Sequence, residues 1–252
     1  MDSAHVTPSK QAFSLVELSI VLVILGLLVG GVLSGQSLIR AAELRSVSTQ
    51  YQQYVAASNS FRDKYFAIPG DMNNAQSFWG VAHATPSTCV TTAGTGTQTC
   101  NGDGNGQINE VTGSNESFRY WQHLANAGLI EGAYNGITQG SDSNSATTAN
   151  VARGRIGNSL WWMRYGSPAS GNFLRFGGVT ANNIPLGMIF KPEEAWNIDT
   201  KLDDGKPNTG RLLTFATSYP ACTDGADGTI LTANYLLSSS AVTCGATFLN
   251  VL

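Results

Sequence analysis

The sequence predicts an α+β fold in which a long N-terminal helical stalk packs on a C-terminal β-sheet head with large loops. Three observations lead to this class. An apolar run with almost no charge occupies residues 13–39, and an amphipathic helical pattern continues it over 40–68. In the remainder, short runs rich in aromatic and β-branched residues alternate with segments rich in Gly, Ser, Thr and Asn.

The apolar run has the length and composition of a membrane-spanning helix. Met1–Ala12 is polar, whereas Phe13–Ile39 contains a single charged residue, Glu17. A helix needs about 20 apolar residues to cross a bilayer. A secretory signal peptide would have a shorter apolar region and then an Ala-x-Ala cleavage site, and no such site precedes Arg40. A plain membrane anchor explains the hydrophobicity but gives no reason for a carboxylate, which is costly in lipid.

Beyond Arg40 the helical pattern continues with one apolar face. Small, apolar or aromatic residues recur at alternating spacings of three and four, and the residues between them are polar. Pro69-Gly70 is expected to end the helix, because Pro disfavours the helical conformation of the residue before it. A coiled-coil dimer is the alternative use of this half of the helix. The predicted buried stripe comprises Leu44, Val47, Tyr51, Tyr54, Ser58, Phe61 and Tyr65.

The head is expected to combine two helices with several short strands. The second helix has Pro192 in its first turn, acidic residues near its N-terminus and Gly205 beyond its end. We expect the aromatic residues of the head to form its core, with a carbohydrate- or surface-binding patch as the alternative. The expected helices cover 116–130 and 192–202, and the expected strands cover 160–165, 173–176, 186–190, 211–217 and 229–237.

The four cysteines are predicted to form two disulfides. Their spacings are not those of the CxxC pairs of a zinc site, and disulfides are the natural state in a head outside the cytoplasm. Four cysteines allow three pairings. We favour the sequence-local pairing of Cys89 with Cys100 and of Cys222 with Cys244, in which each bridge contributes about 3 kcal/mol to stability on the loop-entropy estimate.

The start of the apolar run resembles a known processing site. Residues Lys10–Leu18, with the sequence KQAFSLVEL, are similar to the site at which type IV prepilins and type II secretion pseudopilins are cut. In that family a dedicated peptidase cuts before a Phe, the new N-terminus is methylated, and a Glu lies four residues further on. The resemblance implies cleavage between Ala12 and Phe13, although family members usually carry Gly where this chain has Ala12.

The resemblance also implies a division of the chain and a location. The leader would cover 1–12, the transmembrane and filament-core helix 13–39, the amphipathic stalk 40–68, and the periplasmic or extracellular head 69–252. The implied location is the bacterial inner membrane with the head outside the cytoplasm, and then a periplasmic pseudopilus or a cell-surface pilus. The implied partners are other pilin or pseudopilin subunits, prepilin peptidase, the inner-membrane assembly platform and, before assembly, membrane lipid.

Glu17 acquires a role under this resemblance. After cleavage Phe13 carries a free or methylated amine, and a cation in an apolar setting needs a partner. In a filament the Glu17 carboxylate of one subunit would neutralise the Phe13 amine of its neighbour. The alternative is that the Glu17 side chain only reaches toward the membrane surface.

The function implied is that of a structural subunit of a type IV pilus or a type II secretion pseudopilus. The large head favours a minor or tip-proximal subunit. The alternatives are a DNA-uptake pilus subunit and a membrane-anchored extracytoplasmic hydrolase. The net charge of −3 gives no global attraction for nucleic acid, and Arg153, Arg155, Arg164 and Arg175 are the only local enrichment in basic residues. No GxSxG, P-loop or HExxH motif occurs, so we do not expect an enzyme.

One head segment resembles a calcium-binding loop. Asn101–Asn109, NGDGNGQIN, has oxygen-bearing side chains at alternate positions, Gly at the sixth and an apolar residue at the eighth, like the first nine positions of an EF-hand-type loop. The twelfth position is Thr112, so Glu110 or Glu116 would have to supply the usual carboxylate. Calcium-binding heads are known among pseudopilins. A dissociation constant of roughly 10⁻⁴–10⁻³ M is expected, and a Gly/Asn turn without metal is the alternative. The candidate ligands are Asn101, Asp103, Asn105, Gln107 and Glu110.

A second acidic segment, Asp199–Gly210 or DTKLDDGKPNTG, resembles a recurring segment of large pilin-like heads. We interpret it as the end of a helix followed by a turn. A second cation site or a contact between subunits is the alternative.

Overall fold

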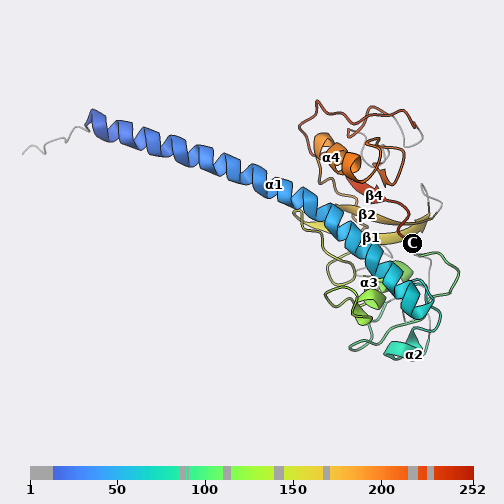
Figure 1. The fold of residues 1–252 in the computed structure, drawn as a ribbon. Coiled ribbons are helices and arrows are strands. Elements are labelled where there is room, and N and C mark those ends of the chain that lie inside the picture. Colours follow the sequence, from blue (N-terminus) through green and yellow to red (C-terminus); the bar gives the residue numbers. More distant parts are fainter. Residues whose placement is uncertain are drawn as a thin grey trace, which may run out of the picture. The chain divides into compact units, whose positions relative to one another are not determined.

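The computed structural model describes residues 14–85, 89, 91–109, 115–138, 145–166, 171–214, 221–225 and 230–252. The chain forms two compact units, Met1–Ala42 and Glu43–Leu252. Helix α1, Leu15–Tyr65, contributes its first part to one unit and its second part to the other. A long N-terminal helix followed by an antiparallel sheet confirms the α+β, pilin-like layout that the sequence predicts (Figure 1).

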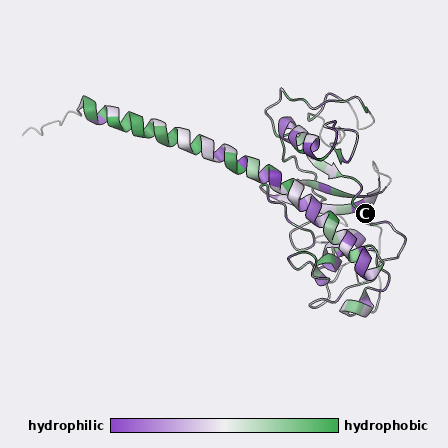
Figure 2. Cartoon of the chain, in the orientation of Figure 1, coloured by the Kyte–Doolittle hydropathy of each residue, from purple (hydrophilic) through white to green (hydrophobic). Residues whose placement is uncertain are grey.

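The first part of α1 is predominantly apolar (Figure 2). Its large apolar side chains are exposed in the isolated chain, and the exposed fraction reaches 84% for Leu15. A helix that is apolar all round is stable only when lipid or other protein surrounds it. This part of the chain therefore requires an apolar environment that it does not supply itself.

The second part of α1 buries one face in the head. Val47, Tyr51, Tyr54, Ser58 and Phe61 are buried, and Leu44 and Tyr65 pack partly buried against the core, which confirms the predicted stripe. The Tyr54 ring lies 4.9 Å from the ring of Trp121 and 5.6 Å from the ring of Trp161, in both cases edge to face. Tyr51 stacks on Phe248 at 4.6 Å.

Helix α1 ends at Tyr65, three residues before the predicted limit of the stalk. Phe66 has a φ of 52°, and its N–H donates to the carbonyl of Arg62 at 2.8 Å. A left-handed residue after the last turn ends a helix, and this position is usually glycine. The chain therefore leaves the helical conformation at Phe66, close to the expected end of the helix and before Pro69-Gly70.

The described residues of the head form an antiparallel sheet of four strands in the order β1-β2-β4-β3. The long strands β1, Ser159–Gly166, and β2, Gly171–Gly178, pair from Ser159 opposite Gly178 to Gly166 opposite Gly171. Both were predicted, because each has a run of alternating aromatic and apolar residues. The short strands β3, Leu212–Leu213, and β4, Ala246–Phe248, complete the sheet.

Three predicted strands differ from the structure. Residues 186–190 form only isolated bridges, with Gly187 opposite Gly178 and Phe190 opposite Cys244. In the segment predicted over 211–217, only β3 is a strand, and residues 215–217 lie outside the described part. Residues 230–237 form no strand, and their Tyr235 makes an isolated bridge with Thr223, which lies outside the four strands of the sheet. The hydrophobic patterns of these segments correctly predicted that some of their side chains are buried. They did not determine whether the segments pair as strands, because pairing depends on residues distant in the sequence.

In the part of the head that the structure describes, the short helices are α2, Gln76–Trp79, α3, Glu116–Asn126, and α4, Pro192–Leu202. Helix α4 has the predicted limits and begins with Pro192, and the Lys191 N–H donates to the Glu194 carboxylate at 2.9 Å. Helix α3 ends four residues before its predicted limit, because Gly128 takes a φ of 72°.

Many aromatic residues of the head lie in its core, as predicted. Trp121, Trp161 and Trp162 are fully buried, and Trp196, on α4, is partly exposed. Disulfides join Cys89 to Cys100 and Cys222 to Cys244, which is the sequence-local pairing. The first bridge holds the chain directly before the Asn101–Asn109 loop, and the second holds the chain directly before β4.

Candidate functional site

Glu17 lies in the first turn of α1 and caps the helix. Its carboxylate accepts the Ser14 N–H at 2.9 Å, and the Ser14 hydroxyl accepts the Val16 N–H at 3.3 Å. The first N–H groups of a helix lack partners within the helix, and the Ser-x-x-Glu pattern supplies them. Sequence reasoning considered a charge partner and a membrane-surface position for Glu17. It missed this third role, although Ser14-Leu15-Val16-Glu17 is a readable capping signal.

Helix α1 is long and apolar enough to cross a membrane, judged by length and composition. The most apolar stretch of this helix lies near the N-terminus, and the rest of the chain does not bury it. The proposed processing residues Ala12 and Phe13 precede this helix and lie outside the described residues. Glu17 therefore stands at the described start of the membrane-compatible helix.

The Asn101–Asn109 loop wraps around the carboxylate of Asp71, a residue that follows α1. One Asp71 oxygen accepts the N–H groups of Gly104 and Asn105 at 2.8 and 3.0 Å, and the other accepts the Gly106 N–H at 2.9 Å. Gly104 and Gly106 have φ values of 76° and 86°, which point successive amides inward. The loop therefore forms a cradle of N–H groups around an acidic side chain from elsewhere in the chain.

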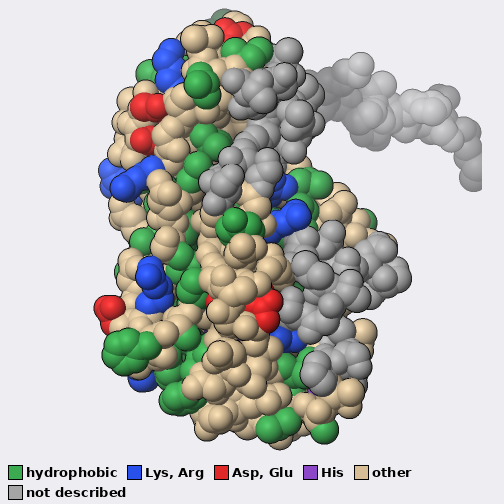
Figure 3. All heavy atoms as spheres, turned by 90° about the vertical axis from the view of Figure 1, so that its right-hand side faces the viewer, with side chains coloured by type: hydrophobic (Ala, Val, Ile, Leu, Met, Phe, Trp, Pro, Cys, Tyr) green, Lys and Arg blue, Asp and Glu red, His purple; other side chains and the backbone are tan. Residues whose placement is uncertain are grey.

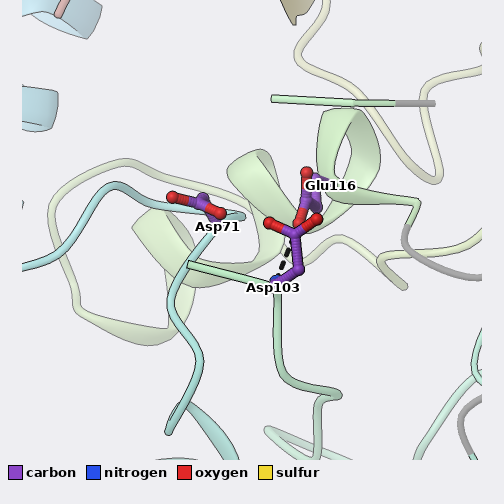
Figure 4. Close-up of side chains that lie close together, drawn as sticks. All are labelled: Asp71, Asp103 and Glu116. Atoms are coloured by element: carbon purple, nitrogen blue, oxygen red, sulfur yellow. Dashed lines mark hydrogen bonds between the residues drawn. The ribbon is translucent and has the colours of Figure 1, made fainter. Parts of the chain in front are cut away.

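Asp71, Asp103 and Glu116 bring three carboxylates together, with ligand atoms within 4.8 Å of one another (Figure 4). Glu116, the first residue of α3, accepts the Asp103 N–H at 3.0 Å and the Asn109 N–H at 2.9 Å. Burial is the main cause that raises the pKa of Glu116 to about 7; the N–H groups of Asn109 and Asp103 oppose the rise, and the charges of Asp103 and Asp71 add to it. Burial also raises the pKa of Asp71. Such an acidic cluster could bind a metal ion.

The calcium ligands predicted from the sequence lie in different places in the structure. Asp103 belongs to the cluster, and Glu116 occupies the place considered for a substitute carboxylate. The Asn101 side-chain oxygen accepts the Gln76 N–H at 2.9 Å, and the Asn105 oxygen accepts the Gln107 N–H at 2.7 Å. Glu110 lies outside the described residues. Sequence reasoning missed Asp71, which is distant in the chain and belongs to no loop pattern.

A second acidic cluster lies at the end of α4. Asp199 is in the helix, Asp203 caps its C-terminus and Asp204 follows, with ligand atoms again within 4.8 Å of one another. The Tyr235 hydroxyl donates to Asp199 at 2.8 Å. Burial raises the pKa of Asp199 to about 7; the Tyr235 hydroxyl and the Gly205 amide oppose this rise, and Asp204 and Asp203 add to it.

The distribution of basic side chains on the surface of the head bears on the DNA-uptake alternative. On the face shown in Figure 3, Lys and Arg side chains stand apart among polar and apolar side chains rather than forming a continuous patch. A nucleic-acid site would need basic side chains gathered on one face. This face therefore gives no support to the DNA-uptake alternative.

Comparison with known proteins gives one result. The family model for the prokaryotic N-terminal methylation motif matches residues 7–33, which contain the predicted cleavage site, Glu17 and the start of α1. No curated protein and no solved structure matches the chain. The chain therefore carries an N-terminal methylation motif, which is typical of type IV pilins and pseudopilins, at the head of a long apolar helix.

Proposed function

We propose that the chain is a structural subunit, minor or tip-proximal, of a type IV pilus or type II secretion pseudopilus. The supporting observation is the methylation motif over 7–33 at the head of a helix with the length and apolarity to cross a membrane. Prepilin peptidase cuts between Ala12 and Phe13. Residues 13–39 then form the membrane and filament-core segment, 40–68 the stalk and 69–252 the head. The partners are other subunits, the peptidase and the inner-membrane assembly platform.

Cleavage is tested by mass. The chain produced with prepilin peptidase should begin at Phe13 and carry one methyl group on its amine, whereas the chain produced without the peptidase should retain residues 1–12. Intact mass spectrometry distinguishes the two products. A mature N-terminus at any other residue would contradict the assignment.

Assembly is tested at Glu17, which the proposal pairs with the Phe13 amine of a neighbour. Glu17→Leu removes this partner and leaves a buried charge at a cost of roughly 3–5 kcal/mol per subunit. It should be processed and remain in the inner membrane but enter filaments poorly. Immunoblots of sheared surface or pseudopilus fractions, compared with membrane fractions, report incorporation.

Glu17→Gln is the matched control for the helix cap. The amide oxygen can still accept the Ser14 N–H but carries no charge. If charge pairing governs assembly, Glu17→Gln should fail as Glu17→Leu does. If Glu17→Gln assembles as well as the wild type, the cap and not the charge is the function of Glu17.

We further propose that the Asn101–Asn109 loop and the Asp71, Asp103 and Glu116 carboxylates bind Ca²⁺ weakly. The carboxylates from three separate segments lie together, and each oxygen that accepts an N–H retains further lone pairs for a cation. Carboxylates, side-chain amides and water are the ligands that Ca²⁺ prefers. Of the ligands predicted from sequence, Asp103 is the central one in this proposal, with Asn101, Asn105 and Gln107 or Glu110 as supplementary donors.

Calcium binding at this loop is tested with the full chain in detergent. Several millimolar CaCl₂ should raise the melting temperature of the head, because a ligand that binds only the native state stabilises it. Asp103→Asn should abolish most of this rise, whereas the matched variant Asp63→Asn, at an exposed position on α1, should retain it. An equal response of Asp103→Asn and wild type would remove the loop as the site.

A further inference from the structure

A positive charge lies buried in the head without an ionic partner. Arg119, on α3, has only 2% of its surface exposed, and it forms no ion pair with any of the described residues. Burial lowers the pKa of Arg119 to about 10, and the charge of Glu116 opposes this, so the guanidinium group stays protonated at neutral pH. A buried charge normally has a partner of opposite sign, because it has lost its water.

The guanidinium group of Arg119 is also incompletely hydrogen-bonded. Its Nη1 donates to the Asn101 carbonyl at 2.6 Å, whereas its buried Nη2 has no acceptor among the described residues. A small void of about 10 Å³ beside Arg119 has room for about one water molecule at most. Such a water would satisfy an N–H group but would leave the positive charge unbalanced.

Arg119 also lines a larger hollow of about 160 Å³, which has room for more than water. Besides Arg119, the only other ionisable side chain among the residues that line it is His83, whose Nε2 lies 2.8 Å from the Thr92 carbonyl oxygen. The hollow therefore joins a positive charge to a wall that contains no carboxylate. The rest of this wall includes Gln76, Val81, Asn101 and the Cys89–Cys100 disulfide.

Two side-chain amides in this hollow add neutral donors to the charge of Arg119. The Asn101 side-chain oxygen accepts the Gln76 N–H at 2.9 Å, which leaves the Asn101 amide nitrogen as a donor. The Gln76 side chain is partly exposed and offers a second amide. A guanidinium group with neighbouring N–H donors is the combination that binds an anionic oxygen most strongly.

We propose that this hollow binds a small monocarboxylate ion, whose oxygens accept N–H groups from Arg119, Gln76 and Asn101. One guanidinium group balances one negative charge, whereas inorganic phosphate is largely doubly charged at neutral pH and would be repelled by Glu116. Val81 and the disulfide give the wall an apolar part, which suits a short hydrocarbon body. The head would thus recognise small organic acids, independently of the filament role and of calcium.

The test uses sodium acetate as the probe and the full chain in deuterated detergent, with a chelator present throughout. Saturation-transfer NMR should detect bound acetate, with saturation at millimolar concentration. Propionate should displace the acetate, whereas phosphate at the same ionic strength should not. Arg119→Gln should weaken acetate binding by at least about tenfold, because the charged donor is lost.

A second variant protects the test against misfolding of the buried Arg119 substitution. Gln76→Glu, at a partly exposed position, places a carboxylate at the hollow and should abolish acetate binding by repulsion. Ser77→Glu is the matched control, because Ser77 is exposed on the same helix and does not line the hollow, and it should bind acetate as the wild type does.

Three results would overturn the proposal: no saturation transfer to acetate in the wild type, displacement of acetate by phosphate as effective as that by propionate, or unchanged acetate binding by Gln76→Glu. Each of them leaves the filament proposal and the calcium proposal untouched, since the measurement uses neither assembly nor calcium.

Discussion

At the scale of single residues, the head places several ionisable groups where they cannot keep their ordinary charge. His123, on α3, is fully buried between the rings of Phe61 and Trp79. Its Nδ1 accepts the Gly70 N–H at 2.9 Å, so this nitrogen carries no proton and the ring is neutral. Burial, together with the charge of Arg119, lowers the pKa of His123 to about 3.

This lowered pKa predicts how stability depends on pH. The unfolded chain takes up a proton on His123 below about pH 6.5, whereas the folded chain stays neutral until about pH 3. The contribution of His123 is therefore fully present above pH 6.5 and is lost as pH falls toward 3, by about 1.4 kcal/mol per pH unit. Glu116 and Asp199, whose pKa values are raised, act in the opposite direction between their ordinary values and about 7.

The contribution of His123 is isolated with His123→Asn, which keeps an acceptor for the Gly70 N–H and has no titrating ring. Denaturant unfolding of both full chains should show the wild type losing its advantage between pH 6 and 4. Tryptophan fluorescence reports unfolding of the head. Parallel curves for the two proteins across this range would contradict the neutral-histidine assignment.

At the scale of elements, the second part of α1 is fixed to the sheet by one polar residue as well as by rings. The Gln50 side-chain oxygen accepts the Trp161 indole N–H and the Arg155 N–H, both at 3.3 Å. Its amide donates to the Arg153 carbonyl at 3.2 Å. Gln50 is buried, so the helical face combines an apolar stripe with a directional contact that fixes its position against β1.

Replacing Gln50 with Leu should destabilise the head by about 1–3 kcal/mol, since it leaves the Trp161 indole N–H and two backbone groups without partners. Gln53→Leu is the matched control, because Gln53 is exposed on the same helix, and it should be close to neutral. Urea denaturation of the two variants measures the difference. Equal midpoints would mean that the Gln50 contacts contribute nothing net.

Local patterns allowed some of these elements to be predicted and not others. Helix α1, α4 and the β1–β2 pair each extend over enough residues for periodicity, caps and alternation to act together. Strands of two and three residues, such as β3 and β4, have no period, and only their partners make them strands. The same distinction applies to the sites. Asp103 belonged to a local motif, whereas Asp71 reaches it only through the folded path of the chain.

At the scale of the whole molecule, the division at Ala42 and Glu43 separates a segment that needs an apolar environment from a head with its own core. The second part of α1 belongs to that core, because Tyr51, Tyr54 and Phe61 are buried among residues of the head. The compact unit of the head therefore includes the second part of α1 and begins at Glu43.

This division predicts the behaviour of truncated chains. A fragment of residues 43–252, exported to an oxidising compartment, should be soluble, form both disulfides and unfold cooperatively. A fragment that begins at Asp71 should not, because it lacks the aromatic residues of α1 that fill the core. Thermal melts followed by circular dichroism and mapping of disulfides under non-reducing conditions would test both fragments. Cooperative melting of the shorter fragment would show that α1 is dispensable to the head.

The hydrogen bond between Glu17 and the Ser14 amide changes how polymerisation should be understood. Under the proposed filament role, a subunit in the membrane would already have a donor for its carboxylate within its own first turn, so its charge would not lack a partner. When the subunit joins the proposed filament, the Glu17 carboxylate exchanges hydrogen-bond partners. The cationic Phe13 amine of the neighbouring subunit replaces the neutral Ser14 N–H of the same chain, or binds beside it. Under this proposal, the contribution of Glu17 to assembly is only the difference between these two partners, and it comes in addition to the burial of the apolar part of α1.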